Sequence, residues 1–412
     1  MKKNIFEIIN YSFAKGIPAL LGLLFTPFLI KNLSVESYGN FNILNQLFLF
    51  LNSFTLITTF TLQREYLKDR LILNKIIIVT LYISNLMFLL FVIFIYRLSL
   101  GSLPFLSLIV FYFIFIFMGI YQNQMIALNA VNNSKAYMFN QVLFSILKFA
   151  FSTTLVIITS NYLSVFIGIA LALIITSYNI LGKLDLHIKN FNMKIDRELI
   201  IKIIKYGLPL SVFSSLDILL NYMDVFLMKV LKGIEYSGIY GGIYNTVNFI
   251  ILFPYSIMAI IILPKIVRYE NENQRKSTVK VVTLSIVTYS LITLPLLALY
   301  FNDNLREFLI NLLLTSDYLP YSDAGFILLV AMILMGLNKI LMIFFQVVLN
   351  NIWRLVVPLL VCLSLNFLLN LLLIQKYHIL GAAIATAVTN ILLFIWLIKI
   401  YLNIRMNENY SR

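Results

Sequence analysis

Long apolar stretches follow one another along almost the whole chain, separated by short polar segments. A helix that crosses a bilayer needs about 20 mainly apolar residues, and most of these stretches reach that length. The pattern predicts about twelve membrane-spanning helices, six on each side of a polar segment at 183–199. The predicted spans are 6–30, 40–63, 74–96, 103–127, 138–160, 162–182, 200–228, 238–263, 279–300, 324–349, 354–374 and 379–401.

Composition agrees with a chain that folds in a membrane. Hydrophobic residues make up 61% of the sequence and charged residues 12%, against about 25% charged residues in soluble domains. Such a chain cannot bury its apolar side chains inside a globule, so we expect an all-α integral membrane protein. The net charge of +14 does not indicate nucleic-acid binding, because the basic residues fall mainly in short loops between apolar stretches.

Those loops also predict the orientation of the chain. Of the 31 Lys and Arg residues, 22 fall on the side of the two termini and five on the other side. Since cytoplasmic loops are enriched in Lys and Arg, both termini are expected in the cytoplasm. One outer loop contains a short amphipathic segment, 305–314, which we expect to lie along the membrane surface.

The two halves of the chain share sequence features. Gly16-Ile17-Pro18 matches Gly207-Leu208-Pro209, and Glu36-Ser37-Tyr38-Gly39 matches Glu235-Tyr236-Ser237-Gly238. Because each half has an even number of spans, the halves enter the membrane in the same direction and form a parallel repeat, as in transporters with a site near the midplane. The sequence therefore predicts two six-helix lobes, 1–182 and 200–412, joined by the linker 183–199.

Short motifs in both halves resemble those of a known family. They are Leu33-Ser34-Val35-Glu36-Ser37-Tyr38-Gly39-Asn40-Phe41, Gln63-Arg64-Glu65, Gly207-Leu208-Pro209, Asp224 followed by Ser237-Gly238-Ile239-Tyr240, Leu263-Pro264, Asn366, Asn370 and Gly381-Ala382-Ala383-Ile384-Ala385-Thr386. With these motifs the chain resembles the polysaccharide-repeat flippases, the Wzx-type O-antigen and capsule proteins. This family belongs to the multidrug/oligosaccharidyl-lipid/polysaccharide exporter superfamily.

The resemblance implies both an architecture and an activity. Family members form a V-shaped pair of six-helix lobes around a central cavity. They move an oligosaccharide linked to undecaprenyl pyrophosphate across the bacterial inner membrane by rocking the lobes. No cofactor is implied beyond a coupling ion, Na⁺ or H⁺. The expected partners are the lipid-linked substrate, membrane lipids and other polysaccharide-assembly proteins.

Four cations are candidates for binding the pyrophosphate. Lys15, Lys148 and Lys339 lie within predicted spans, where an ionised group costs about 2.5–3.5 kcal/mol or more at the helix centre. Lys15 has the alternative of extending to the cytoplasmic face or pairing with a carboxylate. Lys148 and Lys339 have the alternative of hydrogen bonds between helices. Arg64 ends the second predicted span and is a candidate at the entrance, although a topology-setting role explains it fully.

The seventh predicted span carries the candidates for ion coupling. Asp217, Asn221 and Asp224 follow one another at i, i+4 and i+7, which places them on one face of a helix. They are candidates to bind or guide Na⁺ or H⁺. Ion pairs between these acids and Lys15 or Lys339 are an alternative, as is a pair between Asp224 and the nearby Lys229.

Tyr244 and Asn248 in the eighth predicted span are candidates for contacts with sugar hydroxyls. They lie at i and i+4 and therefore on one face of the helix. Amides and hydroxyls within membrane helices also hydrogen-bond neighbouring helices, so this alternative stays open.

Other functions fit the sequence less well. A polytopic glycosyltransferase or polysaccharide polymerase is disfavoured, because the early outer loops are short and lack paired acids. The chain has no phosphate-binding Gly-rich loop followed by Lys and Ser or Thr, and its two histidines, His187 and His378, fall in predicted loops. With one cysteine, Cys362, neither a disulfide within the chain nor a metal site is expected. Ion-coupled export of small molecules is the main alternative.

Overall fold

The computed structural model describes residues 2–67, 69–70, 72–97, 103–131, 133–182, 195–272, 274–348 and 352–410. These residues form helices and contain no strand, which confirms the predicted all-α class. Most of the predicted linker, 183–194, lies outside the described residues.

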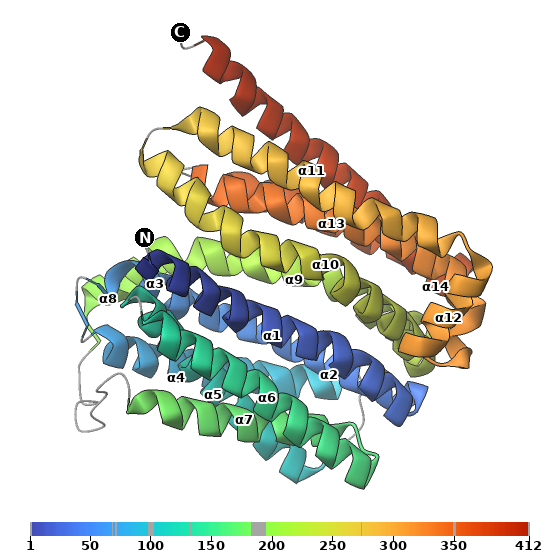
Figure 1. Cartoon of the computed structure of the whole chain (residues 1–412). Helices are drawn as coiled ribbons and strands as arrows, with labels where there is room; N and C mark the ends of the chain where they lie inside the picture. Colours follow the sequence, from blue (N-terminus) through green and yellow to red (C-terminus); the bar gives the residue numbers. More distant parts are fainter. Residues whose placement is uncertain are drawn as a thin grey trace. The chain divides into compact units, whose positions relative to one another are not determined.

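Fourteen α-helices are described (Figure 1). A 3₁₀ turn at Ser53–Thr55 joins α2 and α3, and a π-helical turn at Ile203–Gly207 joins α8 and α9. The helices are α1 Lys2–Asn32, α2 Val35–Asn52, α3 Leu56–Glu65, α4 Ile72–Arg97, α5 Phe105–Ala130, α6 Ser134–Thr159, α7 Leu163–Leu181, α8 Arg197–Lys202, α9 Leu208–Lys232, α10 Ile234–Asn271, α11 Arg275–Tyr300, α12 Asp303–Leu313, α13 Ser322–Val348 and α14 Trp353–Tyr410.

Eleven helical segments of the described chain are long and apolar enough to cross a membrane. The last of them contains His378, whose backbone (φ 52°, ψ −128°) divides α14 into two helices. Counted in this way, the segments correspond to the twelve predicted spans. The second span begins at Val35 rather than at the predicted 40, because the Ser34 hydroxyl accepts a hydrogen bond from the Ser37 N–H (3.2 Å) and caps the helix.

The amphipathic segment predicted at 305–314 is helical, as α12. The Asn302 side chain accepts a hydrogen bond from the Leu305 N–H at 3.1 Å and caps its start. Its location along a membrane surface stays a prediction.

The chain divides into two compact units. Unit 1 comprises Met1–Leu21 and Asn40–Ile218, and unit 2 comprises Gly22–Gly39 and Leu219–Arg412. Each unit therefore takes part of α1, α2 and α9. The predicted lobes, 1–182 and 200–412, stay a prediction.

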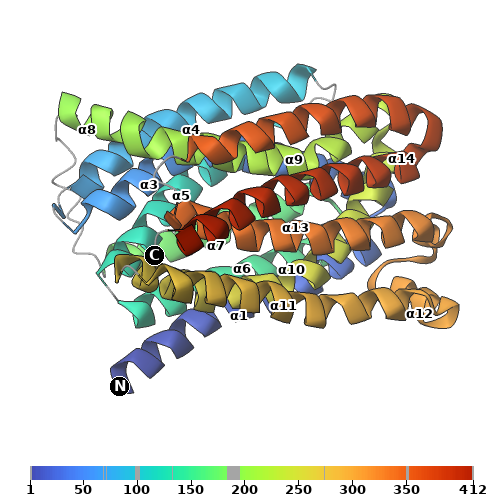
Figure 2. The same cartoon turned by 90° about the horizontal axis from the view of Figure 1, so that it is seen from above.

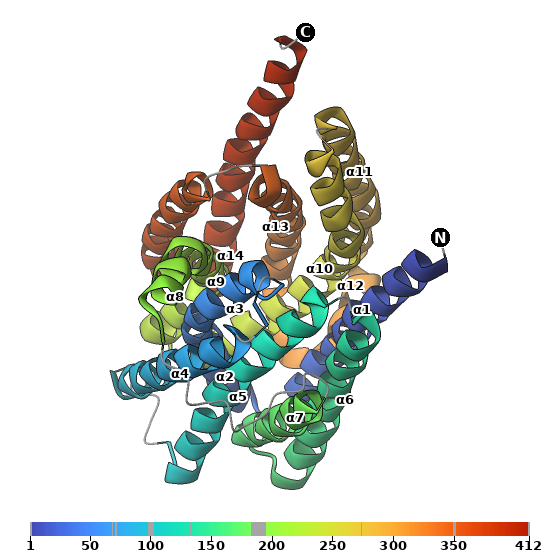
Figure 3. The same cartoon turned by 90° about the vertical axis from the view of Figure 1, so that its left-hand side faces the viewer.

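Unit 1 is built around α5, which packs against α4 and α7, while α7 packs against α6 (Figure 3). Aromatic rings form the centre of this packing. Phe111 on α5 lies with its ring centroid 4.6 Å from that of Phe91 on α4 and 4.5 Å from that of Phe166 on α7. Such ring pairs contribute about 0.5–1.5 kcal/mol beyond the area they bury, so they hold the three helices together.

Unit 2 is built around α13, which packs against α10, α11 and α14 (Figure 2). A glycine permits one of these approaches. A Cβ at Gly336 of α13 would lie 1.9 Å from the hydroxyl oxygen of the buried Tyr289 on α11. The phenol occupies that space, and its hydroxyl donates to the Ile251 carbonyl on α10 at 3.2 Å.

The two copies of the Glu-x-x-Gly motif lie against each other in unit 2. A Cβ at Gly39 would lie 2.6 Å from the carbonyl oxygen of Ile234, and a Cβ at Gly238 would lie 2.2 Å from that of Val35. Each glycine therefore allows the backbone of the other segment to approach. Beside this contact, Asn245 donates a hydrogen bond to the Tyr38 hydroxyl at 3.1 Å.

Candidate functional site

A buried carboxylate in unit 2 is the centre of the candidate site. The side chain of Asp224 on α9 is 0% exposed. Tyr240 on α10 donates its hydroxyl to Oδ2 at 2.7 Å, and Asn370 on α14 donates to Oδ1 at 2.6 Å. Thr386, further along α14, also donates its hydroxyl to Oδ2. Asn366 accepts from Asn370 through its Oδ1 at 2.9 Å, and we name these five residues the Asp224 cluster.

The break in α14 brings the polar residues of this helix to one level. Asn370 precedes His378 by eight positions and Thr386 follows it by eight. Eight helical residues rise about 12 Å, so the two arms return to the same depth. Close packing of the arms requires Gly381, where a Cβ would lie 2.2 Å from the Leu373 carbonyl oxygen.

The cluster surrounds its carboxylate with uncharged donors. Hydrogen bonds to a charged group contribute about 1.5–3 kcal/mol each, whereas burying an ion costs several kcal/mol. A bound proton or a monovalent cation would offset that cost. The Oδ1 atom of Asn370 is buried and accepts no hydrogen bond from the described residues, and oxygen atoms are the ligands that hard cations prefer. The arrangement is therefore chemically suited to binding Na⁺ or H⁺.

The other two candidates for ion coupling lie outside the cluster. Asn221 is buried in unit 2. Asp217 is half-buried and falls in unit 1. Their roles stay predictions.

The candidate lysines occupy three environments. Lys15 is exposed, with Nζ 6.0 Å from the ring centroid of Tyr137 in unit 1. Lys148 on α6 of unit 1 and Lys339 on α13 of unit 2 are half-buried. Beside Lys339, Asn338 donates to the Asn390 carbonyl at 3.2 Å. Their contact with a substrate stays a prediction.

Of the two sugar-contact candidates on α10, Tyr244 packs against the Asp224 cluster. The ring of Tyr244 is buried, with its centroid 5.9 Å from that of Tyr240 and 5.6 Å from that of Tyr222. Asn248 is half-buried, and its Oδ1 accepts no hydrogen bond from the described part of the chain. Tyr244 thus packs directly on a residue that bonds the carboxylate.

The comparisons with known proteins identify the family. A family described as polysaccharide biosynthesis protein matches residues 6–270. The chain belongs to this family. The matched part of the chain includes Asp224 and Tyr240 and ends before Asn366. A search of curated proteins gives no match.

Solved structures show which fold the chain has. An inward-facing multidrug resistance MATE family transporter of the MOP superfamily matches with a TM-score of 0.72 at 14% identity, covering 96% of this chain and 98% of that one. An outward-facing structure of the same description gives 0.69 at 15% identity, covering 96% of each chain. A MOP superfamily transporter from Pyrococcus furiosus gives 0.69 at 16% identity, covering 97% and 96%. The fold is therefore MATE-like, as the resemblance implies.

Three neutral members of the Asp224 cluster are not among the site residues that the sequence predicts. Asn366, Asn370 and Thr386 lie on two arms of a helical hairpin, and only the break at His378 brings them beside Asp224. The i, i+4 spacing of Asn366 and Asn370 within an apolar span was the available signal. Tyr240 lies on the same predicted span as Tyr244. Nothing in the sequence indicates that its hydroxyl contacts the carboxylate of Asp224.

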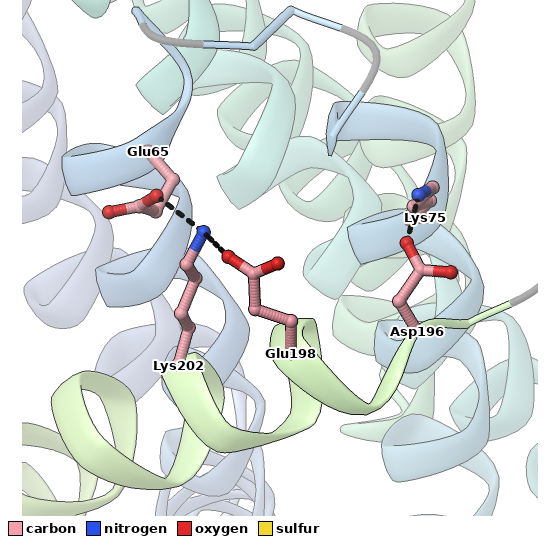
Figure 4. Close-up of polar contacts among 5 residues, drawn as sticks. All are labelled: Glu65, Lys75, Asp196, Glu198 and Lys202. Carbon is pink, nitrogen blue, oxygen red and sulfur yellow. Dashed lines mark hydrogen bonds and ion pairs between the residues drawn. The ribbon is translucent and has the colours of Figure 1, made fainter.

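A second polar group fixes the start of α8 in unit 1 (Figure 4). Lys202 pairs with Glu65 of α3 at 3.2 Å and with Glu198 of its own helix at 2.7 Å. Asp196, just before α8, pairs with Lys75 of α4. The apolar side chains of α8 and the π-turn join a buried cluster there. That cluster includes Leu62, Tyr66, Ile72, Leu73, Ile76, Ile77, Ala127, Leu199 and Ile203.

The Glu65→Gln substitution is expected to weaken this attachment. The Glu65 side chain is 7% exposed and that of Glu198 is 77% exposed. Solvent therefore screens the ion pair between Lys202 and Glu65 less than the pair between Lys202 and Glu198. We expect a loss of about 1–2 kcal/mol of stability for Glu65→Gln and less than about 0.5 kcal/mol for the control Glu198→Gln. Thermal unfolding in detergent measures both, and equal melting temperatures for the two variants would contradict this role.

Proposed function

We propose that this protein is a flippase that moves an oligosaccharide linked to undecaprenyl pyrophosphate across the bacterial inner membrane. Membership of the polysaccharide biosynthesis family supports the proposed substrate class, and the MATE-like fold supports transport by alternating access. The main support for ion-driven transport is the carboxylate of Asp224, which is buried among uncharged donors in a predicted membrane span. The Asp224 cluster binds Na⁺ or H⁺ and couples the gradient to the conformational change.

The remaining polar residues have roles in this scheme. Lys15, Lys148 and Lys339 attract the pyrophosphate, and Tyr244 and Asn248 contact the sugars. Both termini face the cytoplasm. The protein is not an enzyme, since its substrate changes leaflet without a bond being broken, and other polysaccharide-assembly proteins supply and consume that substrate.

A reconstitution experiment tests the proposal. The purified protein is placed in vesicles with a fluorescent undecaprenyl-pyrophosphate oligosaccharide, and an impermeant quencher reports the leaflet of the label. We expect movement that a Na⁺ or pH gradient accelerates. If vesicles with protein move the label no faster than empty vesicles under either gradient, the flippase is excluded.

A second arm of the experiment measures extrusion of cationic dyes from the same vesicles. This arm tests the alternative function, export of small molecules, which the multidrug resistance transporters among the structural neighbours favour. Dye extrusion without movement of the lipid would establish that alternative.

Removing the half-buried lysines is expected to slow lipid movement. Lys148→Gln and Lys339→Gln each remove one cation that attracts the pyrophosphate, and we expect rates about tenfold lower, since a charge-assisted contact contributes about 1.5–3 kcal/mol. Lys15→Ala is measured alongside. The exposed Lys276 of α11 offers the control Lys276→Gln. Rates equal to wild type in all three variants would remove these lysines from the site.

A further inference from the structure

Two cations converge on one aromatic ring where α3 meets the π-turn. The guanidinium carbon of Arg64 lies 4.7 Å from the ring centroid of Tyr206, and Nζ of Lys205 lies 5.4 Å from it. Both cations are exposed. Contact with the ring face restrains a cation and leaves its N–H donors available to a ligand.

Two lysines near this ring form ion pairs with carboxylates, whereas Arg64 and Lys205 form none within the described part of the chain. Lys202 and Lys75 are paired with carboxylates (Figure 4). Within the described residues, neither Arg64 nor Lys205 lies within ion-pair distance of a carboxylate. The ring of Tyr206 is therefore flanked by two positive charges that no acid of the described structure neutralises.

The position of this group is fixed by the packing around it. A Cβ at Gly207 would lie 1.9 Å from the Ile57 carbonyl oxygen, so the π-turn rests directly on the α3 backbone. Ile203 at the other end of the turn is buried. A π-turn inside a helix frequently marks a functional position, and here it sets Lys205 and Tyr206 beside Arg64.

Apolar side chains continue from the cations along the same helix. Ile201, Ile204 and Leu208 are exposed and follow one another at spacings of three and four residues. A ligand that contacts both surfaces has an anionic group at one end and an apolar chain at the other. Two cations beside one ring suit a ligand with two phosphate groups. The apolar residues favour a lipid over a soluble diphosphate.

We propose that Arg64, Lys205 and Tyr206 form a loading site that binds the diphosphate of a polyprenyl-linked substrate at the cytoplasmic surface before translocation. This inference rests on the proposed function for the identity of the substrate. Arg64 contacts one phosphate through paired N–H donors, and Lys205 contacts the other as a point charge. The ring of Tyr206 restrains both cations.

The test measures binding by the full-length protein in nanodiscs of phosphatidylcholine. The probes are farnesyl diphosphate, farnesyl monophosphate and inorganic pyrophosphate. For the double variant Arg64→Gln/Lys205→Gln, we expect affinity for farnesyl diphosphate to fall about tenfold or more. The control Arg70→Gln/Arg197→Gln removes the same charge from exposed positions at the same end of unit 1, and we expect a change of less than about threefold.

Four outcomes would overturn the loading site. They are the absence of farnesyl diphosphate binding by the wild type, an equal loss of affinity in the two double variants, no loss of affinity in either, and equal affinity of the wild type for farnesyl diphosphate and inorganic pyrophosphate.

Lipid movement is measured in parallel. Movement by the wild type with unchanged binding in Arg64→Gln/Lys205→Gln rejects the site and retains the flippase. Selective loss of binding without movement by the wild type retains the site and rejects the flippase.

Discussion

Replacing Asp224 with alanine is expected to reduce gradient-driven transport to the level of empty vesicles. The substitution removes the only carboxylate of the Asp224 cluster, so Tyr240, Asn370 and Thr386 each lose one hydrogen-bond acceptor. An unpaired buried donor costs about 1–3 kcal/mol, so the melting temperature is also expected to fall. Fluorescence quenching in vesicles under a Na⁺ or a pH gradient measures transport, and thermal unfolding measures stability.

Asp224→Asn separates coupling from stability. The amide keeps the shape of the side chain and removes its charge, so the variant is expected to fold but to lose the acceleration that a gradient gives. The acid Asp323 at the start of α13 is exposed, and Asp323→Asn serves as the control with an unchanged response. If a gradient accelerates transport by Asp224→Asn as much as transport by the wild type, Asp224 has no role in coupling. Whether a Na⁺ or a pH gradient drives the wild type identifies the coupling ion.

Gly207→Ala is expected to disrupt the attachment of α9 to α3. The added Cβ would lie 1.9 Å from the Ile57 carbonyl oxygen and 2.8 Å from the Thr61 hydroxyl oxygen. The nearer atom belongs to a helix backbone and cannot rotate away. Overpacking costs about 1–3 kcal/mol and occasionally more, and we expect the variant at or above the upper end of that range, with low yield and a reduced melting temperature.

The internal repeat provides a matched control for this substitution. Gly16 begins the motif Gly16-Ile17-Pro18 as Gly207 begins Gly207-Leu208-Pro209. Apart from its own helix, however, no described residue has an atom within 4 Å of a Cβ built at Gly16. Gly16→Ala is therefore expected to keep wild-type stability and yield. Comparable melting temperatures for the two alanine variants would show that the contact at Gly207 relaxes without cost.

The course of the helices follows directly from the sequence, because each span must satisfy its own backbone hydrogen bonds and cover its length with apolar side chains. Boundaries are less predictable. The start of α2 at Val35 depends on the cap at Ser34, and the π-turn at Ile203–Gly207 depends on packing against α3. Neither feature changes the hydrophobic pattern.

The candidate site was also predictable only in part, because most of it depends on packing between helices. Asp224 is conspicuous as an acid in an apolar span, and helical spacing pointed to Asp217 and Asn221 as its companions. The hydrogen-bonding partners described for Asp224 come from α10 and α14, where a break at His378 and close packing at Gly381 determine which side chains meet. These contacts join residues that are 16 to 162 positions apart in sequence. Helical periodicity relates only residues within one helix, so it cannot predict such contacts.

The contact between Gly39 and Gly238 limits which residues either position accepts. Val35 and Ile234 occupy corresponding places in it, 199 positions apart, as do the two glycines. Each segment thus presents the same surface to the other, which is the arrangement of an isologous interface between identical subunits. Because the contact is reciprocal, a larger residue at either glycine would push apart the same two helix starts, so the two copies of the motif constrain each other.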